Sequence, residues 1–162
     1  LLDSGGNLIG VNTAIYSPSG SNAGIGFAIP SNTAFRIASD LIQHGRVIRP
    51  YLGLQLSFAV TPRIAKALNL PVQSGLLVSV VQRNSPAAKA GLRGGTQSLV
   101  IRNRELLLGG DIITELNGQK ANSVDNFINT IEAKRPGDTI SLKIYRGASP
   151  MTVKVVLEER RS

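Results

Sequence analysis

The chain has 162 residues, 42% of them hydrophobic, and a formal net charge of +8. This length suits either one domain or a domain with a sizeable appendage, and the apolar content is enough for a real core. Cysteine is absent, which excludes disulfides, thiolate catalysis and zinc–cysteine sites. The one histidine, His44, has no second histidine as a metal partner, and it follows an apolar helical run, where a cation suits the negative helix end. We therefore expect no metal and no cofactor.

The positive charge invites a nucleic-acid hypothesis, but its distribution argues against it. The basic residues are spread singly, and no basic run is interleaved with aromatic side chains. A solvated basic surface is the preferred interpretation, and nucleic acid is not an expected partner. No stretch approaches the ~18 continuous apolar residues of a membrane span. The chain begins without a methionine or a signal-like segment, which says nothing about the protein from which it comes.

The first part of the chain is predicted to be two strands and a helix. Residues 8–16 and 24–30 have the β-branched or Gly-punctuated composition of strands, and residues 3–7 and 17–22 are rich in turn formers. Two strands cannot bury enough surface to stand alone, so this part should be the end of a larger β domain. Ser31 is the expected N-cap of a helix that ends at Gly45.

A short linker with a boundary near residue 47 leads to a second, mixed region. Its predicted elements are a strand from residue 52, a helix from Thr61-Pro62 to Leu68, a central strand 75–81, a short helix opened by Ser85-Pro86, a strand 110–116 ended by the turn Asn117-Gly118, a helix capped by Ser123, closing strands 139–145 and 151–157, and a charged tail. Residues 92–108 are expected to form a long loop that is only weakly strand-like at 98–101.

Residues 49–56, RPYLGLQL, carry the strongest functional signal in this second region. Gly53 lets the backbone turn with its amides unshielded, and leucines alternate with polar or small residues after it, as in a half-buried strand. Successive N–H groups in such a turn form a concave anion site, and the following strand can accept an added peptide strand. The alternative is an ordinary strand that starts after a linker proline.

Five short segments together resemble a PDZ domain of the kind attached to HtrA/Deg serine proteases. They are YLGL at 51–54, VQRNSPAAKAGL at 81–92, GGDII at 109–113, LNG at 116–118 and RPGD at 135–138. The resemblance covers residues 50–158, and it departs from many relatives in the insertion-like residues 93–108. It implies a mostly β fold with α-helices: a PDZ-like, partly open β-barrel with two short helices and one longer helix.

The first 45 residues resemble the last strands and terminal helix of the trypsin-like β-barrel protease domain in the same family. The implied division is 1–46 for this protease remnant, 47–158 for the PDZ domain and 159–162 for the tail. The family's nucleophile motif would lie just before Leu1, and the sequence given does not contain it. Ser4 is interpreted as a turn residue, and the fragment is expected to be catalytically inactive. Ile25 and Gly26 would be remnants of the substrate cleft, although core packing explains Ile25 equally well.

The resemblance and the chemistry of residues 49–56 together imply a peptide site. The amides of Leu52, Gly53 and Leu54 would hold a terminal carboxylate beside Tyr51, with attraction from Arg49, and Gln55 and Leu56 would pair with the peptide backbone. One side of the helical ridge of Val124, Ile128 and Ile131 would close the groove, while Phe127 would point into the core.

The expected partners are peptides or unfolded-protein segments, with homo-oligomerisation of the parent protein. The resemblance implies a parent that is a serine endopeptidase of protein quality control in a bacterial extracytoplasmic compartment. A PDZ-type scaffold module unconnected to proteolysis is the alternative function. The protease-like first strands argue against that alternative.

Overall fold

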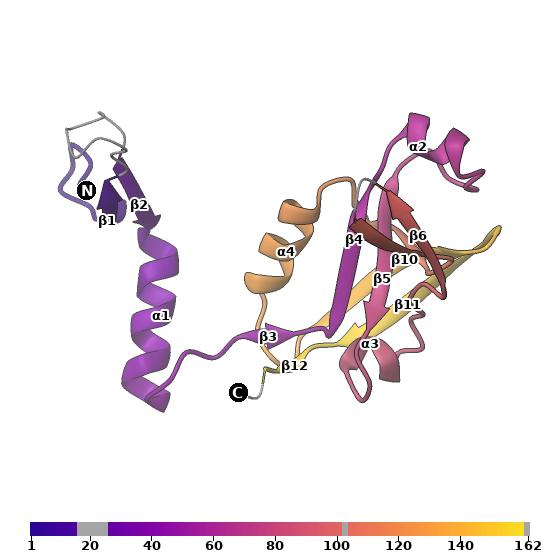
Figure 1. The fold of residues 1–162 in the computed structure, drawn as a ribbon. Helices are drawn as coiled ribbons and strands as arrows, with labels where there is room; N and C mark the ends of the chain where they lie inside the picture. The colour runs from indigo at the N-terminus through magenta and orange to yellow at the C-terminus, as the bar shows by residue number, and fades with distance from the viewer. Residues whose placement is uncertain (16–25, 102–103, 161–162) are drawn as a thin grey trace. The chain divides into compact units, whose positions relative to one another are not determined.

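The computed structural model describes residues 1–15, 26–101 and 104–160, and the chain divides into two compact units, Leu1–Ile48 and Arg49–Ser162 (Figure 1). In the first unit, strands β1 (Gly10–Ile15) and β2 (Gly26–Pro30) pair antiparallel and lead into helix α1 (Ser31–His44). The expected turn at 17–22 and the strand residues Tyr16, Gly24 and Ile25 lie outside the described residues.

The start of α1 differs from the sequence prediction. Ser31 is the first helical residue and not the N-cap, because Pro30 occupies the capping position and no side chain caps the helix. The physical reason is that the strand runs straight into the helix, with the Ser31 N–H donating to the Ile9 carbonyl at 3.1 Å. The end of the helix is confirmed, since Gly45 is left-handed (φ 68°) and its N–H donates to the Leu41 carbonyl.

The second unit is built on a sheet with the strand order β11-β10-β8-β5-β4, and β9 is paired to β8 (Figure 1). The strands of the unit are β3 (Pro50–Tyr51), β4 (Leu54–Val60), β5 (Gly75–Val81), β6 (Gln97–Ile101), β7 (Arg104–Leu108), β8 (Ile112–Leu116), β9 (Gln119–Lys120), β10 (Thr139–Arg146), β11 (Ser149–Val156) and β12 (Glu158–Glu159). The helices are α2 (Pro62–Ala67), α3 (Pro86–Lys89) and α4 (Val124–Glu132). The predicted mostly β fold with helices is confirmed.

Local capping chemistry explains where these helices begin. The side chains of Thr61, Ser85 and Ser123 each accept a hydrogen bond from the backbone N–H three residues later, as the sequence predicted. The turn at Asn117-Gly118 is also confirmed, since both residues have positive φ, 51° and 81°, and the chain reverses there from β8 to β9.

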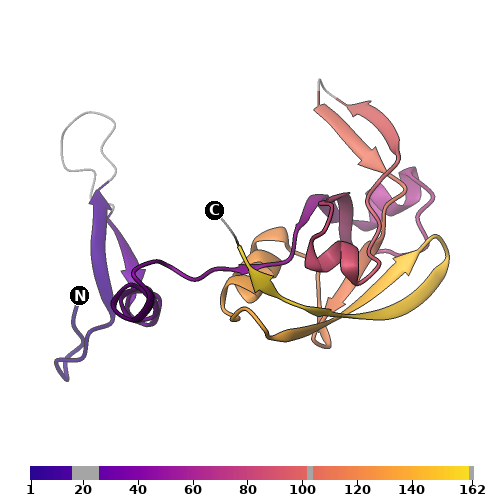
Figure 2. The same cartoon turned by 90° about the horizontal axis from the view of Figure 1, so that it is seen from below.

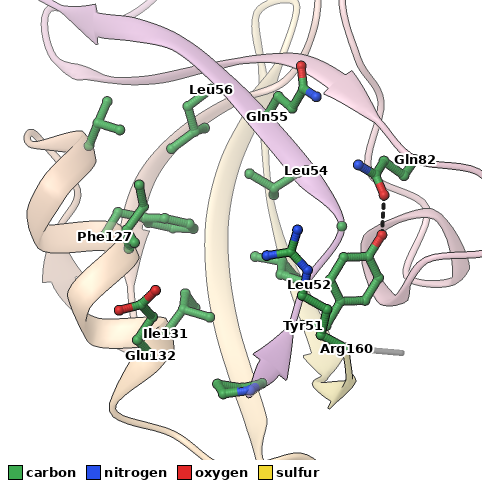
Figure 3. Close-up of a pocket in the computed structure, with 14 residues that line it drawn as sticks. Tyr51, Leu52, Leu54, Gln55, Leu56, Gln82, Phe127, Ile131, Glu132 and Arg160 are labelled. Atoms are coloured by element: carbon green, nitrogen blue, oxygen red, sulfur yellow. Dashed lines mark hydrogen bonds between the residues drawn. The ribbon is translucent and has the colours of Figure 1, made fainter. Parts of the chain in front are cut away.

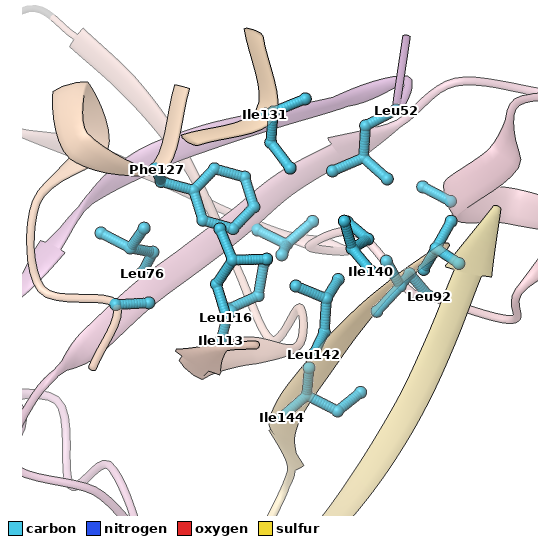
Figure 4. Packing of buried hydrophobic residues seen from close by; sticks show 14 of the residues in the cluster. Leu52, Leu76, Leu92, Ile113, Leu116, Phe127, Ile131, Ile140, Leu142 and Ile144 are labelled. Carbon is cyan, nitrogen blue, oxygen red and sulfur yellow. The ribbon is translucent and has the colours of Figure 1, made fainter. Parts of the chain in front are cut away.

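The core of this unit lies on both faces of the sheet. Figure 4 shows the larger cluster, in which sheet residues such as Leu76, Ile113 and Leu142 pack beneath Phe127 and Ile131 of α4. A smaller cluster, which includes Leu77, covers the opposite face of β5. Leu76 and Leu77 belong to different clusters because successive strand side chains point to opposite faces. Helix α4 is thus held over the β4 end of the sheet.

Two sequence predictions are wrong in this unit. Residues 92–108 are not a long loop, because β6 and β7 pair antiparallel from Gln97 opposite Leu108 to Ile101 opposite Arg104, and this hairpin gives the insertion its own backbone hydrogen bonds (Figure 2). The charged tail is also partly a strand, since Glu158 and Glu159 of β12 pair with Tyr51 and Pro50 of β3. Over the residues that the structure describes, no helix is long and apolar enough to cross a membrane.

Candidate functional site

A groove of about 410 Å³ lies between β4 and α4, and it is open at one side of the PDZ-like unit (Figure 3). It is lined by Pro50, Tyr51, Leu52, Gly53, Leu54, Gln55, Leu56, Gln82, Val124, Phe127, Ile128, Ile131, Glu132 and Arg160. The structure thereby brings together the sequence-predicted residues from 51 to 56 and the three predicted helix residues. All the predicted peptide-binding residues are described by the structure, and of these only Arg49 does not line the groove.

In the loop at the start of β4, hydrogen bonds hold two carbonyl groups on the side that faces α3 and the end of β5. The Leu52 carbonyl accepts from the Ala87 N–H of α3, and the Gly53 carbonyl accepts from the Gln82 N–H, both at 2.9 Å. In a trans peptide the carbonyl and the following N–H point to opposite sides, and the described residues contain no cis peptide bond. The N–H groups of Gly53 and Leu54 therefore point away from α3 and β5, toward the open side.

The strand that follows is an open edge. β4 stands at the end of the strand order, with only β5 as a neighbour in the sheet. Leu54 lies opposite Val81, and the bond from Gln82 N–H to Gly53 carbonyl makes this a pair that exchanges no hydrogen bonds with each other. The N–H and the carbonyl of Leu54 consequently face outward, where another extended chain can accept and donate.

Apolar side chains form the floor and the far wall of the groove. Leu52 is buried, and Leu54 and Leu56 are half-buried against the main core cluster. From α4, Phe127 and Ile131 are only 4% and 7% exposed, so they form the fixed base of the wall. Ile128 is 45% exposed and stands at the rim, and Val124 is half-buried. Phe127 points into the core as expected, yet it also lines the groove.

Polar groups lie at the loop end of the groove. The Tyr51 hydroxyl donates a hydrogen bond to Gln82 Oε1 and ties the loop to the end of β5. Figure 3 shows the Arg160 guanidinium beside Leu52 and Leu54, with Glu132 on the helix opposite. Arg160 reaches this place because its N–H donates to the Arg49 carbonyl at 3.0 Å, next to the β3–β12 pair. Arg160 was not among the predicted site residues, since the last residues were expected to form only a charged tail.

The residues considered for catalysis lie in the first unit. Ser4 is in a turn closed by Asp3, whose carboxylate accepts from the backbone N–H groups of Gly5 and Asn7. The side-chain hydrogen bond from Asn7 is the main cause of a lowered Asp3 pKa. His44 is in the last turn of α1, and the described residues include no hydrogen bond between it and Ser4. Gly26 begins β2, whereas Ile25 lies outside the described residues.

A family model of the PDZ domain matches residues 50–157 of this chain. Because the match covers more than half of the sequence, the chain belongs to the PDZ domain family. Its relatives place this PDZ domain among those of the HtrA/Deg-type serine endoproteases.

Two curated relatives align with practically the whole chain, first unit included. The periplasmic pH-dependent serine endoprotease DegQ of Escherichia coli K12 is 41% identical over 100% of this chain and 32% of its own length. The chloroplastic Protease Do-like 1 of Arabidopsis thaliana is 39% identical over 99% of this chain and 34% of its own length. The chain thus spans about a third of these relatives.

Solved structures give the same picture. HtrA-type protease AlgW with a decapeptide has a TM-score of 0.73 at 36% identity, covering 99% of this chain and 44% of that one. HtrA-type protease AlgW with a tripeptide has a TM-score of 0.70 at 35% identity, covering 99% of this chain and 48% of that one. The match to the HtrA/Deg type therefore extends over both units.

Proposed function

We propose that the PDZ unit binds extended peptides with a free C-terminus and an apolar last residue, which add as a strand to β4. The observation that carries the proposal is the meeting of three features in one groove: the outward N–H groups of Gly53 and Leu54, the open edge of β4, and the apolar wall of α4. Main-chain hydrogen bonds would supply affinity, and the apolar wall would supply selectivity. The peptide-containing structures of related AlgW support this choice of ligand class.

The terminal carboxylate of the peptide would lie at the loop. Leu52, Gly53 and Leu54 would direct their amides at it, as a turn of successive N–H groups favours an anion. Arg160 lines this end of the groove and would add attraction, while Arg49 would contribute only at longer range. Leu54 would then pair with the peptide backbone through its outward N–H and carbonyl, and Leu56 would continue this edge. The backbone of Gln55, also expected to pair, is turned toward β5, where its carbonyl accepts from Ser79 Oγ at 3.0 Å. The side chain of the last residue would enter the apolar space beneath Ile128 and Ile131.

The first unit has a separate proposed role. We assign residues 1–46 to the C-terminal part of a trypsin-like protease domain, residues 47–158 to the PDZ domain and 159–162 to a tail, on the basis of the whole-chain similarity to DegQ. The parent activity would be endoproteolysis in protein quality control, with Gly26 bordering the substrate cleft. A bacterial extracytoplasmic compartment and a homo-oligomeric parent would fit that assignment. This chain alone would be inactive, since a serine nucleophile needs a base within hydrogen-bond reach and the described residues include no hydrogen bond between Ser4 and His44, its single histidine.

Calorimetry with one peptide in two forms tests the peptide proposal. A peptide with a free carboxylate and a final valine should bind with micromolar affinity, on the order of −8 kcal/mol, because ordering a flexible peptide offsets much of the contact energy. Amidating its C-terminus should weaken binding about tenfold or more, since a charged hydrogen-bond acceptor is lost. Equal affinity of the two forms would remove carboxylate capture from the proposal.

A pair of matched variants tests the location of the site. Leu54→Asp should weaken binding of the free peptide by placing a charge in the apolar groove. Met151→Asp makes the same kind of change on β11, the opposite edge strand, where Met151 is 37% exposed. Binding should be unchanged in this control. Equal binding by both variants, with thermal unfolding showing that both are folded, would place the site elsewhere.

A further inference from the structure

A second hollow adjoins the groove on the hairpin side of β4. Its volume is about 520 Å³, and it is lined by Gln55, Leu56, Ser57, Ser79, Val80, Leu106 and Leu107. Gln55 and Leu56 also line the groove beneath α4, so the two spaces flank the same stretch of β4. The hollow is therefore next to the edge at which the proposed peptide adds.

The hairpin β6–β7 supplies Leu106 and Leu107 to this hollow, whose other apolar lining residues are Leu56 and Val80. Leu106 and Leu107 are half-buried in it, whereas Val100 on the other strand is 66% exposed and does not line it. Figure 2 shows the hairpin projecting from the body of the PDZ unit. A projecting segment that turns apolar side chains toward a sheet edge creates a surface that a chain lying along that edge can cover.

The base of the hairpin is rigidly attached to the sheet. The Gly95 N–H donates to the Ser79 carbonyl at 2.8 Å, and the Thr96 N–H donates to the Leu108 carbonyl at 2.9 Å. A Cβ atom on Gly95 would be only 2.6 Å from the carbonyl carbon of Leu107, so the backbones are in close contact there. The hollow is consequently a built feature of the domain, held in place next to β5.

The geometry of strand addition determines which peptide residues meet this hollow. A chain added to β4 presents alternate side chains to opposite faces of the sheet. On β4 itself, Leu54 and Leu56 pack against the main core cluster on the α4 side, whereas the intervening Gln55 lines the hollow. If the last and third-last peptide side chains face α4, the second-last and fourth-last side chains face Gln55, Ser57 and the hairpin.

We infer that the β6–β7 hairpin is a second specificity element, in which Leu106 and Leu107 select apolar side chains at the second-last and fourth-last positions of the bound peptide. This inference rests on the proposed peptide binding at β4. It makes the preferred ligand an extended segment that is apolar on both faces, as in an unfolded protein chain, and not one with a single apolar end. Hydrophobic contact with half-buried leucines is the interaction that carries the preference.

Two peptides and two variants test the inference. Both peptides end in the same free valine and share the same third-last residue, but one carries valine and the other serine at the second-last and fourth-last positions. Leu107→Ser should weaken binding of the valine peptide by roughly tenfold, the loss expected when a partly buried apolar contact is removed. It should leave the serine peptide within twofold of its original affinity. Val100→Ser, on the same hairpin but outside the hollow, should change neither.

The outcomes separate this inference from the proposed function. Equal effects of Leu107→Ser on the two peptides, or no effect on either, would overturn the role of the hairpin while leaving the groove beneath α4 intact. If Leu107→Ser bound neither peptide, that would count as an equal effect on the two. A retained thermal unfolding transition would show that this variant is folded. Failure of both peptides to bind the unaltered protein would instead overturn the proposed function, and the inference with it.

Discussion

Ser85 lies directly against Gly53. A Cβ atom on Gly53 would stand 2.1 Å from Ser85 Cβ and 2.7 Å from Ser85 Oγ. The same Ser85 hydroxyl donates to the Gly53 carbonyl at 3.3 Å and accepts from the Ala88 N–H at 3.2 Å as the cap of α3. The loop before β4 and the start of α3 are thus held together, and the orientation of the loop amides depends on a glycine that has no room for a side chain.

Gly53→Ala should therefore destabilise the PDZ unit more than an ordinary glycine replacement. Its positive φ of 79° costs about 1 kcal/mol for a residue with a side chain, and contact with Ser85 should add about 1–3 kcal/mol of overpacking. Gly118→Ala is the matched control, because Gly118 has φ 81° but no atom within 4 Å of the added carbon. Urea unfolding measures both. Similar losses of stability in the two variants would argue that the Ser85 contact is relieved without cost.

The two arginines near the loop should differ in their effect on peptide affinity. Arg160 lines the groove, whereas Arg49 does not. Arg160→Gln should weaken the free-carboxylate peptide about two- to fivefold, as expected for a solvent-exposed charge interaction, and leave the amidated peptide unchanged. Arg49→Gln should change both by less than twofold. Calorimetric titration distinguishes them, and a larger effect at Arg49 would return the role to the residue that the sequence suggested.

A buried ion pair next to the hairpin should be important for stability. Asp111 is 1% exposed, and Arg146 binds both of its carboxylate oxygens at 2.8 Å while also donating to the Gly91 carbonyl. Arg146→Met would leave a buried carboxylate without its partner. The free energy of unfolding should fall by about 3 kcal/mol. This is at the lower end for the loss of one partner of a buried ion pair, because the Arg146 side chain is itself 27% exposed and water can partly replace it. Denaturant unfolding measures this difference.

Lys143 on the same strand is the control for that experiment. It forms an exposed ion pair with Glu115 at 2.9 Å, and the hydrogen bond that its Nζ donates to this carboxylate raises the Lys143 pKa above its ordinary value. A raised lysine pKa means that the pair's contribution is present below the ordinary pKa of 10.5 and is lost as pH rises through the folded-state value. Lys143→Met should produce no measurable loss of stability at neutral pH, and an NMR titration should show the Lys143 pKa falling in Glu115→Gln.

The first unit should cause the isolated chain to self-associate. Phe35 and Ile42 of α1 are 77% and 84% exposed, and Phe27 of β2 is 57% exposed. Exposed apolar side chains on a small unit with an open two-stranded sheet recruit other chains. Light scattering should detect oligomers that diminish in the double variant Phe35→Ser, Ile42→Ser, and not in the control Val156→Ser on β11. A monomer in which the amides of β1 and β2 resist exchange would contradict the prediction.

Local signals were sufficient to predict most elements of the PDZ unit. Thr61, Ser85 and Ser123 cap their helices through contacts three residues away, and the Asn117-Gly118 turn depends only on its own backbone preference. The turn glycine Gly53 could equally be predicted, because the stretch around it combines a turn residue with strand alternation. Each of these features depends on residues that are close together in the chain, so it can be predicted directly from the sequence.

The features that sequence reasoning missed all depend on pairing between distant segments. Residues 104–108 form a strand only by pairing with residues 97–101. The length of the segment 92–108 favoured the prediction of a loop instead. Arg160 enters the groove only because Glu159 pairs with Pro50. These two residues are far apart in the sequence, and no local pattern encodes their pairing. Ser31 was wrongly predicted as the N-cap of α1 for a related reason. Its N–H donates to the carbonyl of the distant Ile9, and Ser31 is already the first residue of the helix.

The pairing of β3 with β12 places the beginning and the end of the PDZ unit side by side, Tyr51 opposite Glu158. A short linker could therefore join these ends, and new ends could be opened at the exposed Asn117-Gly118 turn, without separating β4 from α4 or from the hairpin. Such a circular permutant would retain the groove although its chain begins in the middle of the present sequence. The groove is thus a property of the closed fold, and the same unit is suited to insertion into a surface loop of another protein.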